Sequence, residues 1–114
     1  MHRQPLVNPA VYNLRHVVDG WIPFSLLDTG GLAVAWARDL LGSARGADVS
    51  FDALIEMAST VPEGSDGLVF LPYLSGERTP YPDPLARGAF VGLTVRHGLQ
   101  HMGRSVLEGV AFGL

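Results

Sequence analysis

Residues 67–114 read GLVFLPYLSGERTPYPDPLARGAFVGLTVRHGLQHMGRSVLEGVAFGL, and this stretch decides the fold. The apolar run over 68–72 predicts a buried strand that ends at Pro72, because proline cannot donate a hydrogen bond within a sheet. Residues 75–87 are rich in proline and glycine, and they predict an ordered loop without regular structure. Residues 88–94 predict a second strand.

The end of the chain predicts a helix from about His97 to Leu114. Its apolar side chains recur at the spacing of one helical face, namely Leu99, Met102, Val106 and Val110. Arg104 and Glu108 lie four residues apart on another face, where a surface ion pair contributes a few tenths of a kcal/mol.

The N-terminal part of the chain predicts a hairpin. Residues 1–10 are polar and carry two prolines, so we expect them to be extended or loose. Strand-compatible residues over 11–18 and 21–24 flank the turn-forming pair Asp19-Gly20, which favours an antiparallel hairpin.

Two helices are expected next. Thr29 is suited to cap a helix that runs to about Leu41, and Gly42 is placed to end it. Its apolar face is formed by Leu32, Trp36 and Leu40. Ser50 is suited to cap a second helix that runs to about Ser59. The apolar stripe of that helix is Phe51, Leu54, Ile55 and Ala58, and a connector rich in turns follows over 61–67.

The alternation of strands and helices predicts an α/β domain. A helix that connects two parallel strands needs a second strand after it, and the last predicted helix ends with the sequence. We therefore expect part of a domain, or a domain that lacks one edge.

Composition narrows the function classes. A net charge of −3 and a pI near 5.7 argue against a nucleic-acid-binding surface. The absence of cysteine excludes disulfides, thiolate catalysis and zinc–thiolate sites. No apolar run is long enough to span a bilayer, and the first residues lack the apolar core of a signal peptide, so we expect a soluble, cytoplasmic protein.

Three sets of residues are candidates for chemistry. Ser75 lies near Glu77, but SGER is not a nucleophile elbow, so a Ser-His-Asp hydrolase is disfavoured. His97 and His101 have the spacing of a metal-binding pair, but no third ligand is evident, and a solvent-facing pair is the simpler interpretation. Thr29-Gly30-Gly31 is either a phosphate-binding helix N-terminus, or its glycines only ease the entry of the chain into the helix.

The loop around Glu77 and Arg78 leaves two interpretations open. It is either a structural loop in which Arg78 ties carbonyls or a carboxylate together, or one wall of a ligand cleft. The same two interpretations, a structural role or a place in a ligand cleft, are open for Arg87.

The end of the chain resembles the second signature of the FGGY carbohydrate kinases. That pattern pairs a small residue with an apolar one two positions later, here Gly88 and Phe90, and continues with Gly92-Leu93. After seven residues come His101-Met102, and Ser105-Val106-Leu107-Glu108 closes the pattern. The flanking FLPYLSGERTP and ARGAF segments are more similar to xylulokinases than to glycerol kinases.

The resemblance extends upstream, where Gly31-Leu32 and Trp36-Ala37-Arg38-Asp39 are similar to a family helix with a glycine followed by WxRD. It covers nearly all of residues 1–114 and is strongest over 67–114. It implies part of the C-terminal, nucleotide-binding lobe of a kinase, with the ribonuclease H-like fold of the actin-like ATPases.

The same resemblance implies a function for the parent protein. These kinases phosphorylate sugars with ATP and Mg²⁺, and the xylulokinase-like segments imply D-xylulose as substrate and xylulose 5-phosphate as product. Gly31 is the one cofactor-binding residue implied, beside the ATP phosphates, and no catalytic or metal-binding residue is implied. Some relatives carry glutamine four residues after this glycine, where this chain has Ala35.

Other parts of the family pattern are absent from the sequence. These are the N-terminal phosphate loop, the catalytic aspartate, the second phosphate loop and the glycine-rich adenosine motif. We therefore expect Met1 to mark a truncated start and the fragment to be inactive, without tight cofactor binding. Its expected partner is the remainder of the kinase, including the N-terminal sugar-binding lobe, and alone it is expected to pair with itself or fold loosely. The alternative is a standalone binding module without catalysis.

Overall fold

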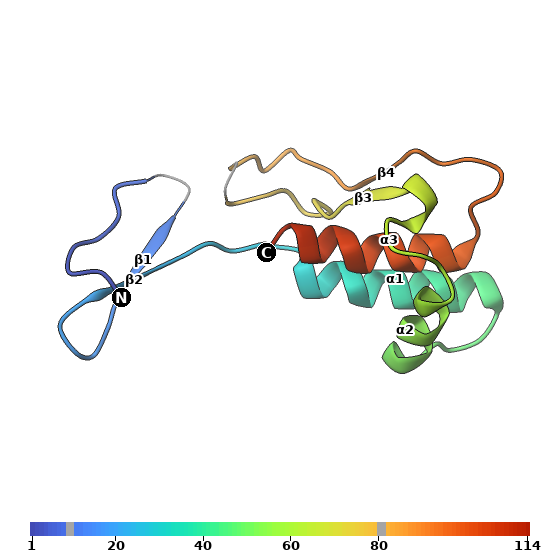
Figure 1. The fold of residues 1–114 in the computed structure, drawn as a ribbon, viewed down its shortest axis with the longest axis horizontal. Coiled ribbons are helices and arrows are strands. Elements are labelled where there is room, and N and C mark those ends of the chain that lie inside the picture. The colour runs from blue at the N-terminus through green and yellow to red at the C-terminus, as the bar shows by residue number, and fades with distance from the viewer. Residues whose placement is uncertain (9–10, 80–81) are drawn as a thin grey trace.

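The chain is elongated rather than compact. The structure is a computed structural model that describes residues 1–8, 11–79 and 82–114. Its extents are 52 × 26 × 24 Å and its radius of gyration is 17.1 Å, whereas a compact domain of this length has a radius of about 13 Å. Figure 1 shows the reason, because the β1–β2 hairpin stands at one end and an extended segment joins it to a body of helices and strands.

The predicted hairpin is confirmed. Strands β1 (Tyr12–Arg15) and β2 (Trp21–Phe24) are antiparallel, and Tyr12 lies opposite Phe24. His2 extends this pairing through two backbone hydrogen bonds with Trp21. The expected extended segment at the N-terminus is therefore anchored at its start, while residues 9 and 10 lie outside the described residues.

Helix α1 (Gly30–Arg45) is longer than predicted. It ends at Gly46, whose φ of 68° is left-handed and whose N–H bonds the carbonyls of the last turn. The expected stop at Gly42 is wrong, since Gly42 lies inside the helix and is buried. A Cβ at Gly42 would stand 2.9 Å from the carbonyl oxygen of Ala47, so this glycine allows a close approach and does not end the helix.

The predicted apolar face of α1 is not the buried one. Leu32 and Leu40 are 56% and 40% exposed, and Trp36 packs at the edge of the core. A core cluster in the body consists of the buried residues Ala33, Ala37, Phe70 and Val106, with Phe90 and Val110 packed against them. Small side chains on α1 leave room for the aromatic rings, which explains why a face of alanines is turned inward.

Helix α2 (Phe51–Ser59) is confirmed with its predicted cap, because the Ala53 N–H donates to Ser50 Oγ at 3.1 Å. The predicted stripe is only half buried. Leu54 and Ala58 are inside, whereas Phe51 and Ile55 are exposed. A short helix therefore buries a narrower face than its apolar pattern suggests.

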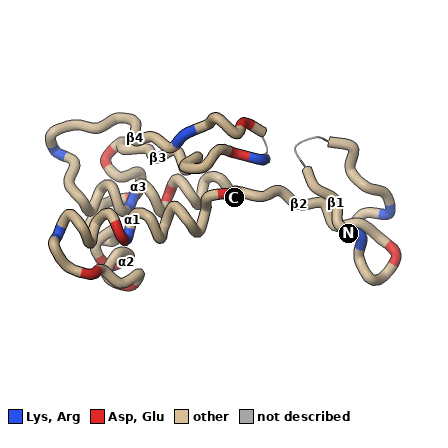
Figure 2. The backbone as a smooth tube through the Cα atoms, turned by 180° about the vertical axis from the view of Figure 1, so that it is seen from behind, with Lys and Arg blue, Asp and Glu red and all other residues tan. Residues whose placement is uncertain are grey.

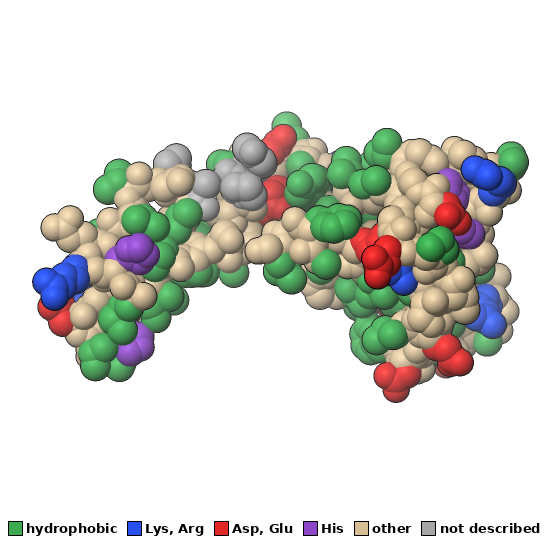
Figure 3. Space-filling model, viewed as in Figure 1, with side chains coloured by type: hydrophobic (Ala, Val, Ile, Leu, Met, Phe, Trp, Pro, Cys, Tyr) green, Lys and Arg blue, Asp and Glu red, His purple; other side chains and the backbone are tan. Residues whose placement is uncertain are grey.

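Strands β3 (Val69–Leu71) and β4 (Ala89–Val91) form an antiparallel ribbon at the predicted positions, with Phe70 opposite Phe90. The expectation of a fully buried strand is wrong, because Val69 and Leu71 are 48% and 36% exposed on the outer face. Hydrophobic side chains are visible at the surface of both the hairpin and the body in Figure 3. The described parts of the 75–87 loop are irregular, as predicted, apart from isolated bridges that pair Leu74 with Gly76 and Glu77 with Asp83.

Helix α3 (Leu99–Phe112) confirms the predicted last helix, although it begins two residues later. It packs against α1, α2 and β3, and Val106 and Val110 contact the core as expected. The fold is thus mixed α/β, with two separate two-stranded sheets in the part of the chain that the structure describes. None of the described helices has the length and apolar character needed to cross a membrane.

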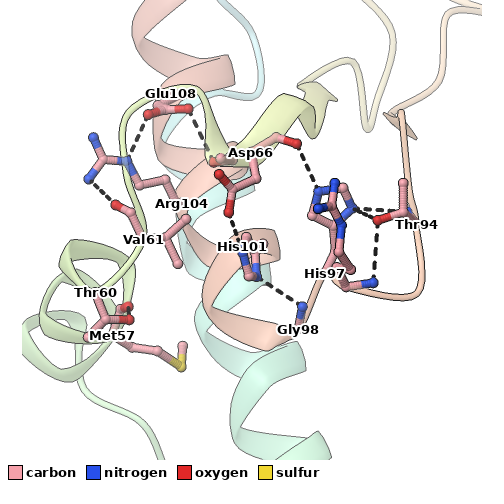
Figure 4. Close-up of polar contacts among 12 residues, drawn as sticks. Met57, Thr60, Val61, Asp66, Thr94, His97, Gly98, His101, Arg104 and Glu108 are labelled. Carbon is pink, nitrogen blue, oxygen red and sulfur yellow. Dashed lines mark hydrogen bonds and ion pairs between the residues drawn. The ribbon is translucent and has the colours of Figure 1, made fainter.

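A left-handed turn leads into β3. Residues 64–67 all have positive φ, at 83°, 50°, 52° and 89°. Glu108 of α3 (Figure 4) holds the turn. Its carboxylate accepts from Gly64 N at 3.0 Å and from Ser65 Oγ at 3.2 Å. Arg104 joins them, donating to Glu108 Oε1 at 2.7 Å and to Val61 O at 3.1 Å.

Arg104 and Glu108 are therefore not the surface pair that was expected. Their side chains are 22% and 19% exposed, because the connector over 61–67 covers them. Burial alone would raise the pKa of Glu108, but hydrogen bonds from Arg104, Gly64 and Ser65, with the charge of Arg104, hold that pKa below its ordinary value.

Two glycines of α3 test how tightly this helix packs. A Cβ at Gly109 would stand 2.3 Å from the carbonyl oxygen of Phe70, whereas one at Gly103 would stand 3.1 Å from the tip of Leu54. We expect Gly109→Ala to lower the free energy of unfolding by about 1–3 kcal/mol, since backbone must move. Gly103→Ala should change it by less than about 1 kcal/mol, because a side chain can rotate and alanine favours the helix. Urea unfolding of the two variants checks this, and equal effects would contradict it.

The pH dependence of stability tests the Glu108 contacts. Because the folded state lowers the pKa of Glu108, these contacts stabilise fully above the unfolded pKa, about 4.3, and are lost as pH falls through the folded pKa. We expect Glu108→Gln to cost about 1–2 kcal/mol at pH 7 and much less near pH 3. Denaturant melts of both proteins across this range measure the difference. A difference that is constant with pH would show that the ionised carboxylate contributes nothing.

Candidate functional site

The candidate site lies at the N-terminal end of α1, where Thr29 occupies the N-cap position. The predicted capping role of Thr29 is wrong, since its side chain makes no capping hydrogen bond. Its hydroxyl instead donates to the carbonyl oxygen of Pro72, and the residue is buried. Thr29 therefore fastens the start of α1 to the end of β3.

Gly30 and Gly31 follow, and their surroundings differ. Gly30 is buried, and a Cβ there would lie 3.4 Å from Leu27 and 3.6 Å from Val110. Gly31 is exposed, and, apart from its chain neighbours and the backbone of its own helix, no described atom lies within 4 Å of where its Cβ would stand. A Cβ at position 30 would make ordinary contacts, so burial limits that position to a small residue without requiring glycine. At position 31 packing sets no such limit on size.

The electrostatics at this helix end suit an anion. The first turn of α1 has no acidic residue, and in the described part of the chain no side chain caps its N–H groups. Asp28 lies just before the helix, but its carboxylate pairs with Arg78 at 3.1 Å. Unpaired N–H groups and the helix dipole give this end a partial positive charge, which favours a phosphate oxygen.

The loop over 75–79 holds the segment that leads into α1. Thr79 Oγ1 donates to Leu26 O at 2.6 Å and accepts from Leu26 N at 2.7 Å. Glu77 Oε1 in turn accepts from the amides of Arg78 and Thr79 at 2.7 and 3.3 Å. Glu77 is buried, and its Oε2 has no hydrogen-bond partner among the described residues. These contacts favour the structural interpretation of the loop.

The two arginines of this region also have structural contacts. Arg78 ties Asp28 to the loop, and Arg87 donates to the carbonyls of Pro84 and Ala86 at 3.1 and 2.7 Å. Charges of both signs are interspersed along the chain and form no basic patch among the described residues (Figure 2). Ser75 is exposed, and the carboxylate of Glu77 bonds backbone amides instead, so the hydrolase interpretation gains no support.

The predicted solvent-facing histidine pair is wrong for His101, which is 9% exposed. Its Nδ1 accepts from Gly98 N at 3.0 Å, and Nε2 lies 3.1 Å from Asp66 Oδ2 (Figure 4). His97 Nε2 lies 3.2 Å from the Asp66 carbonyl. The described residues contain no group of three or more side chains that could hold a metal, so this pair is part of the contact between α3 and the turn.

The segment 36–39 also has structural roles. Trp36 stacks on Phe70 with ring centroids 5.9 Å apart, and Arg38 lies over the Phe51 ring at 4.4 Å. A hollow of about 740 Å³ near Arg38 is lined by Asp39 and Asp48, at the opposite end of α1 from Gly31. Its carboxylates make it a poor site for a phosphate.

Comparisons with known proteins agree with this geometry. Residues 2–114 match the model of the FGGY family of carbohydrate kinases, C-terminal domain. The chain is 42% identical over 101 residues to a gluconokinase from Bacillus subtilis (strain 168), covering 82% of the chain and 20% of that protein. It is also 42% identical over 106 residues to a xylulose kinase from Klebsiella pneumoniae, covering 92% of the chain and 21% of that protein.

A solved structure gives the same result. The ligand-bound xylulose kinase from Lactobacillus acidophilus matches with a TM-score of 0.84 and 35% identity, over 97% of this chain and 22% of that one. The chain thus spans about a fifth of the length of the relatives it matches. Because the family model covers residues 2–114, the resemblance inferred from the signature is confirmed, and the chain belongs to the FGGY family of carbohydrate kinases.

Proposed function

We propose that this chain is part of the nucleotide-binding lobe of an ATP-dependent sugar kinase, with the N-terminal end of α1 facing the ATP phosphates at Gly31. The partner is the remainder of the kinase, including a sugar-binding N-terminal lobe. D-xylulose, converted to xylulose 5-phosphate, is the proposed substrate because the flanking segments resemble xylulokinases. Gluconate is the second candidate, because a gluconokinase and a xylulose kinase are equally similar to the chain.

The observation that carries this proposal is the open space at Gly31. Neither packing nor an unusual φ requires glycine there, since no described atom outside its own helix and chain neighbours lies within 4 Å of a Cβ and its φ is not positive. Glycine in the first turn costs up to about 1 kcal/mol relative to alanine. A phosphate that must come close to the helix N–H groups explains this cost, because a side chain would hold it away.

The contribution of this chain to phosphoryl transfer is binding and orientation. Bound ATP supplies the phosphoryl group, and Mg²⁺ neutralises its charge. Backbone N–H groups at the start of α1 hold phosphate oxygens, while Thr29 and Thr79 fix the position of the helix. We assign no metal ligand and no catalytic base to the described residues, so both belong to the remainder of the protein.

The outer face of the ribbon supports the proposed partner. Val69 and Val91 lie opposite each other in the register and are 48% and 53% exposed. Leu71 adds to the same apolar face. Contiguous apolar surface of this kind marks a contact, and the remainder of a kinase about five times longer is the proposed cover.

A chimeric kinase tests the proposed function. Two chimeras are made. In one, this chain replaces the matched fifth of the Klebsiella pneumoniae xylulose kinase, and in the other it replaces the matched fifth of the Bacillus subtilis gluconokinase. We expect both chimeras to phosphorylate a sugar with ATP and to keep the sugar preference of the host, because the sugar contacts lie outside this segment. Folded chimeras that bind sugar but do not use ATP would contradict the proposed role in nucleotide binding.

Substitution of Gly31 separates binding from packing. In the chain alone, Gly31→Ala should raise the free energy of unfolding by up to about 1 kcal/mol, because the position is open and helical. In the chimera, Gly31→Val should raise KM for ATP about 10-fold to 100-fold, which corresponds to the loss of charge-assisted hydrogen bonds, and should leave KM for the sugar within about twofold.

Ser43→Val is the matched control for this experiment. It places the same branched side chain on an exposed position at the other end of α1, and both KM values should stay unchanged. An unchanged KM for ATP in the folded Gly31→Val chimera would remove Gly31 from the nucleotide site.

The chain alone should have no kinase activity. It lacks the aspartates that supply a base and bind metal in the family, so neither alignment nor charge neutralisation is achieved. Coupled assays for ADP release with D-xylulose or gluconate should give the rate of a heat-killed control. Sugar-dependent ADP release above that control would show that these 114 residues are sufficient.

A further inference from the structure

We propose that His101, Arg104 and Glu108 of α3 form a clamp that holds the left-handed turn 64–67 in a strained conformation, and that this clamp sets the positions of β3 and of the start of α1. The signature positions His101 and Glu108 are then positioning residues and not catalytic ones. The consequence for nucleotide binding rests on the proposed function, whereas the clamp itself does not.

The strain lies in two residues. Ser65 and Asp66 have φ of 50° and 52°, between two glycines that also have positive φ. For side chains other than glycine this region costs free energy at each residue. Two such residues in succession persist only where their surroundings hold them.

The surroundings here are polar groups of α3. Glu108 bonds both Gly64 N and Ser65 Oγ, and Ser65 is fully buried. His101 meets the Asp66 carboxylate at 3.1 Å, and Arg104 bonds the Val61 carbonyl at 3.1 Å. The three side chains lie on successive turns of one helix, so they act on the turn from one side (Figure 4).

The turn is connected to the start of α1 through β3. Leu68 N bonds Ser65 O at 3.1 Å, and the strand begins one residue later. The strand lies against Gly109, and the Pro72 carbonyl beyond it accepts the Thr29 hydroxyl. A change in the turn is therefore transmitted along residues 68–72, which include β3, to the helix end.

Gly92 supports the turn from the other side. It has a φ of 91°, and a Cβ there would stand 2.6 Å from the carbonyl oxygen of Gly67. His97 adds a contact to the Asp66 carbonyl, and its Nδ1 accepts from Thr94 N at 3.0 Å. The loop between β4 and α3 thus closes over the turn, and its conformation depends on the clamp.

Hydrogen exchange of the 114-residue chain without nucleotide tests the clamp. In Glu108→Gln, the amides of Gly64, Gly67 and Leu68 should exchange about 10-fold to 100-fold faster, the range expected for one lost hydrogen bond to a charged group. Ala33, whose amide bonds Thr29 O, should also exchange faster. Ala53, whose amide bonds Ser50 Oγ in α2, should change by less than about threefold.

Two substitutions of Ser65 measure the strain directly. Ser65→Ala and Ser65→Gly both remove the hydroxyl, but only glycine relieves the positive φ. We expect the glycine variant to have a folding equilibrium constant about 5-fold to 30-fold larger than that of the alanine variant. At Ser43, which is exposed inside α1, the same pair should show the opposite order. Ser65→Gly should also slow the exchange of Gly67 when it is added to Glu108→Gln.

Defined outcomes would overturn the proposal. Unchanged exchange at Gly64, Gly67 and Leu68 in Glu108→Gln would show that the turn does not need the clamp, and unchanged exchange at Ala33 would break the link to α1. A folding equilibrium constant of Ser65→Ala that equals or exceeds that of Ser65→Gly would show that the turn is unstrained. If Glu108→Gln unfolds the whole chain, the Ser65 pair decides, because both variants keep Glu108. A failure of Gly31 to bind nucleotide would leave all of these results unaffected.

Discussion

The close approach of Gly109 to the Phe70 carbonyl is the constraint on which the body of this chain depends. A Cβ at position 109 would stand 2.3 Å from that oxygen, so only glycine lets β3 lie directly against α3. The Phe70 side chain then reaches the alanine face of α1, where Ala33 and Ala37 are buried. Just beyond the strand, the Pro72 carbonyl accepts the hydroxyl of Thr29, so this segment contacts both long helices, which also pack directly against each other.

Most of the signature residues that identify the family take part in this packing. A Cβ at Gly88 would stand 2.7 Å from the Leu74 side chain, and one at Gly92 would meet the Gly67 carbonyl. Phe90 packs against Phe70, with the two rings tilted and their centroids 4.9 Å apart. His101 and Glu108 bond the turn before β3. The contacts of the signature residues therefore fit a ribbon, a turn and a helix together.

Local patterns predicted most of the secondary structure, because each depends on neighbours in the sequence. The hairpin around Asp19-Gly20 and the Ser50 cap are examples. The predictions failed where a distant contact decided the outcome. Gly42 looked like a helix stop but is required by the Ala47 carbonyl, and Glu108 looked exposed but is covered by a turn 44 residues away. The sequence of one helix does not show which of its faces packs against aromatic rings from other elements, the face of small side chains or the face of larger apolar ones.

At the candidate site, too, the sequence alone leaves two interpretations open, and the structure adds the surroundings of each residue. In the sequence, Gly30 and Gly31 are an undivided pair at a helix start, and either packing or phosphate binding would explain both. The structure separates them by their surroundings, because Gly30 is buried and a Cβ there would contact Leu27 and Val110, whereas Gly31 is exposed and faces open space. Where packing accounts for a residue, no further role is needed to explain it. Gly31 has no such contact outside its own helix among the described residues, which is the observation behind our proposal that a phosphate approaches the helix backbone there.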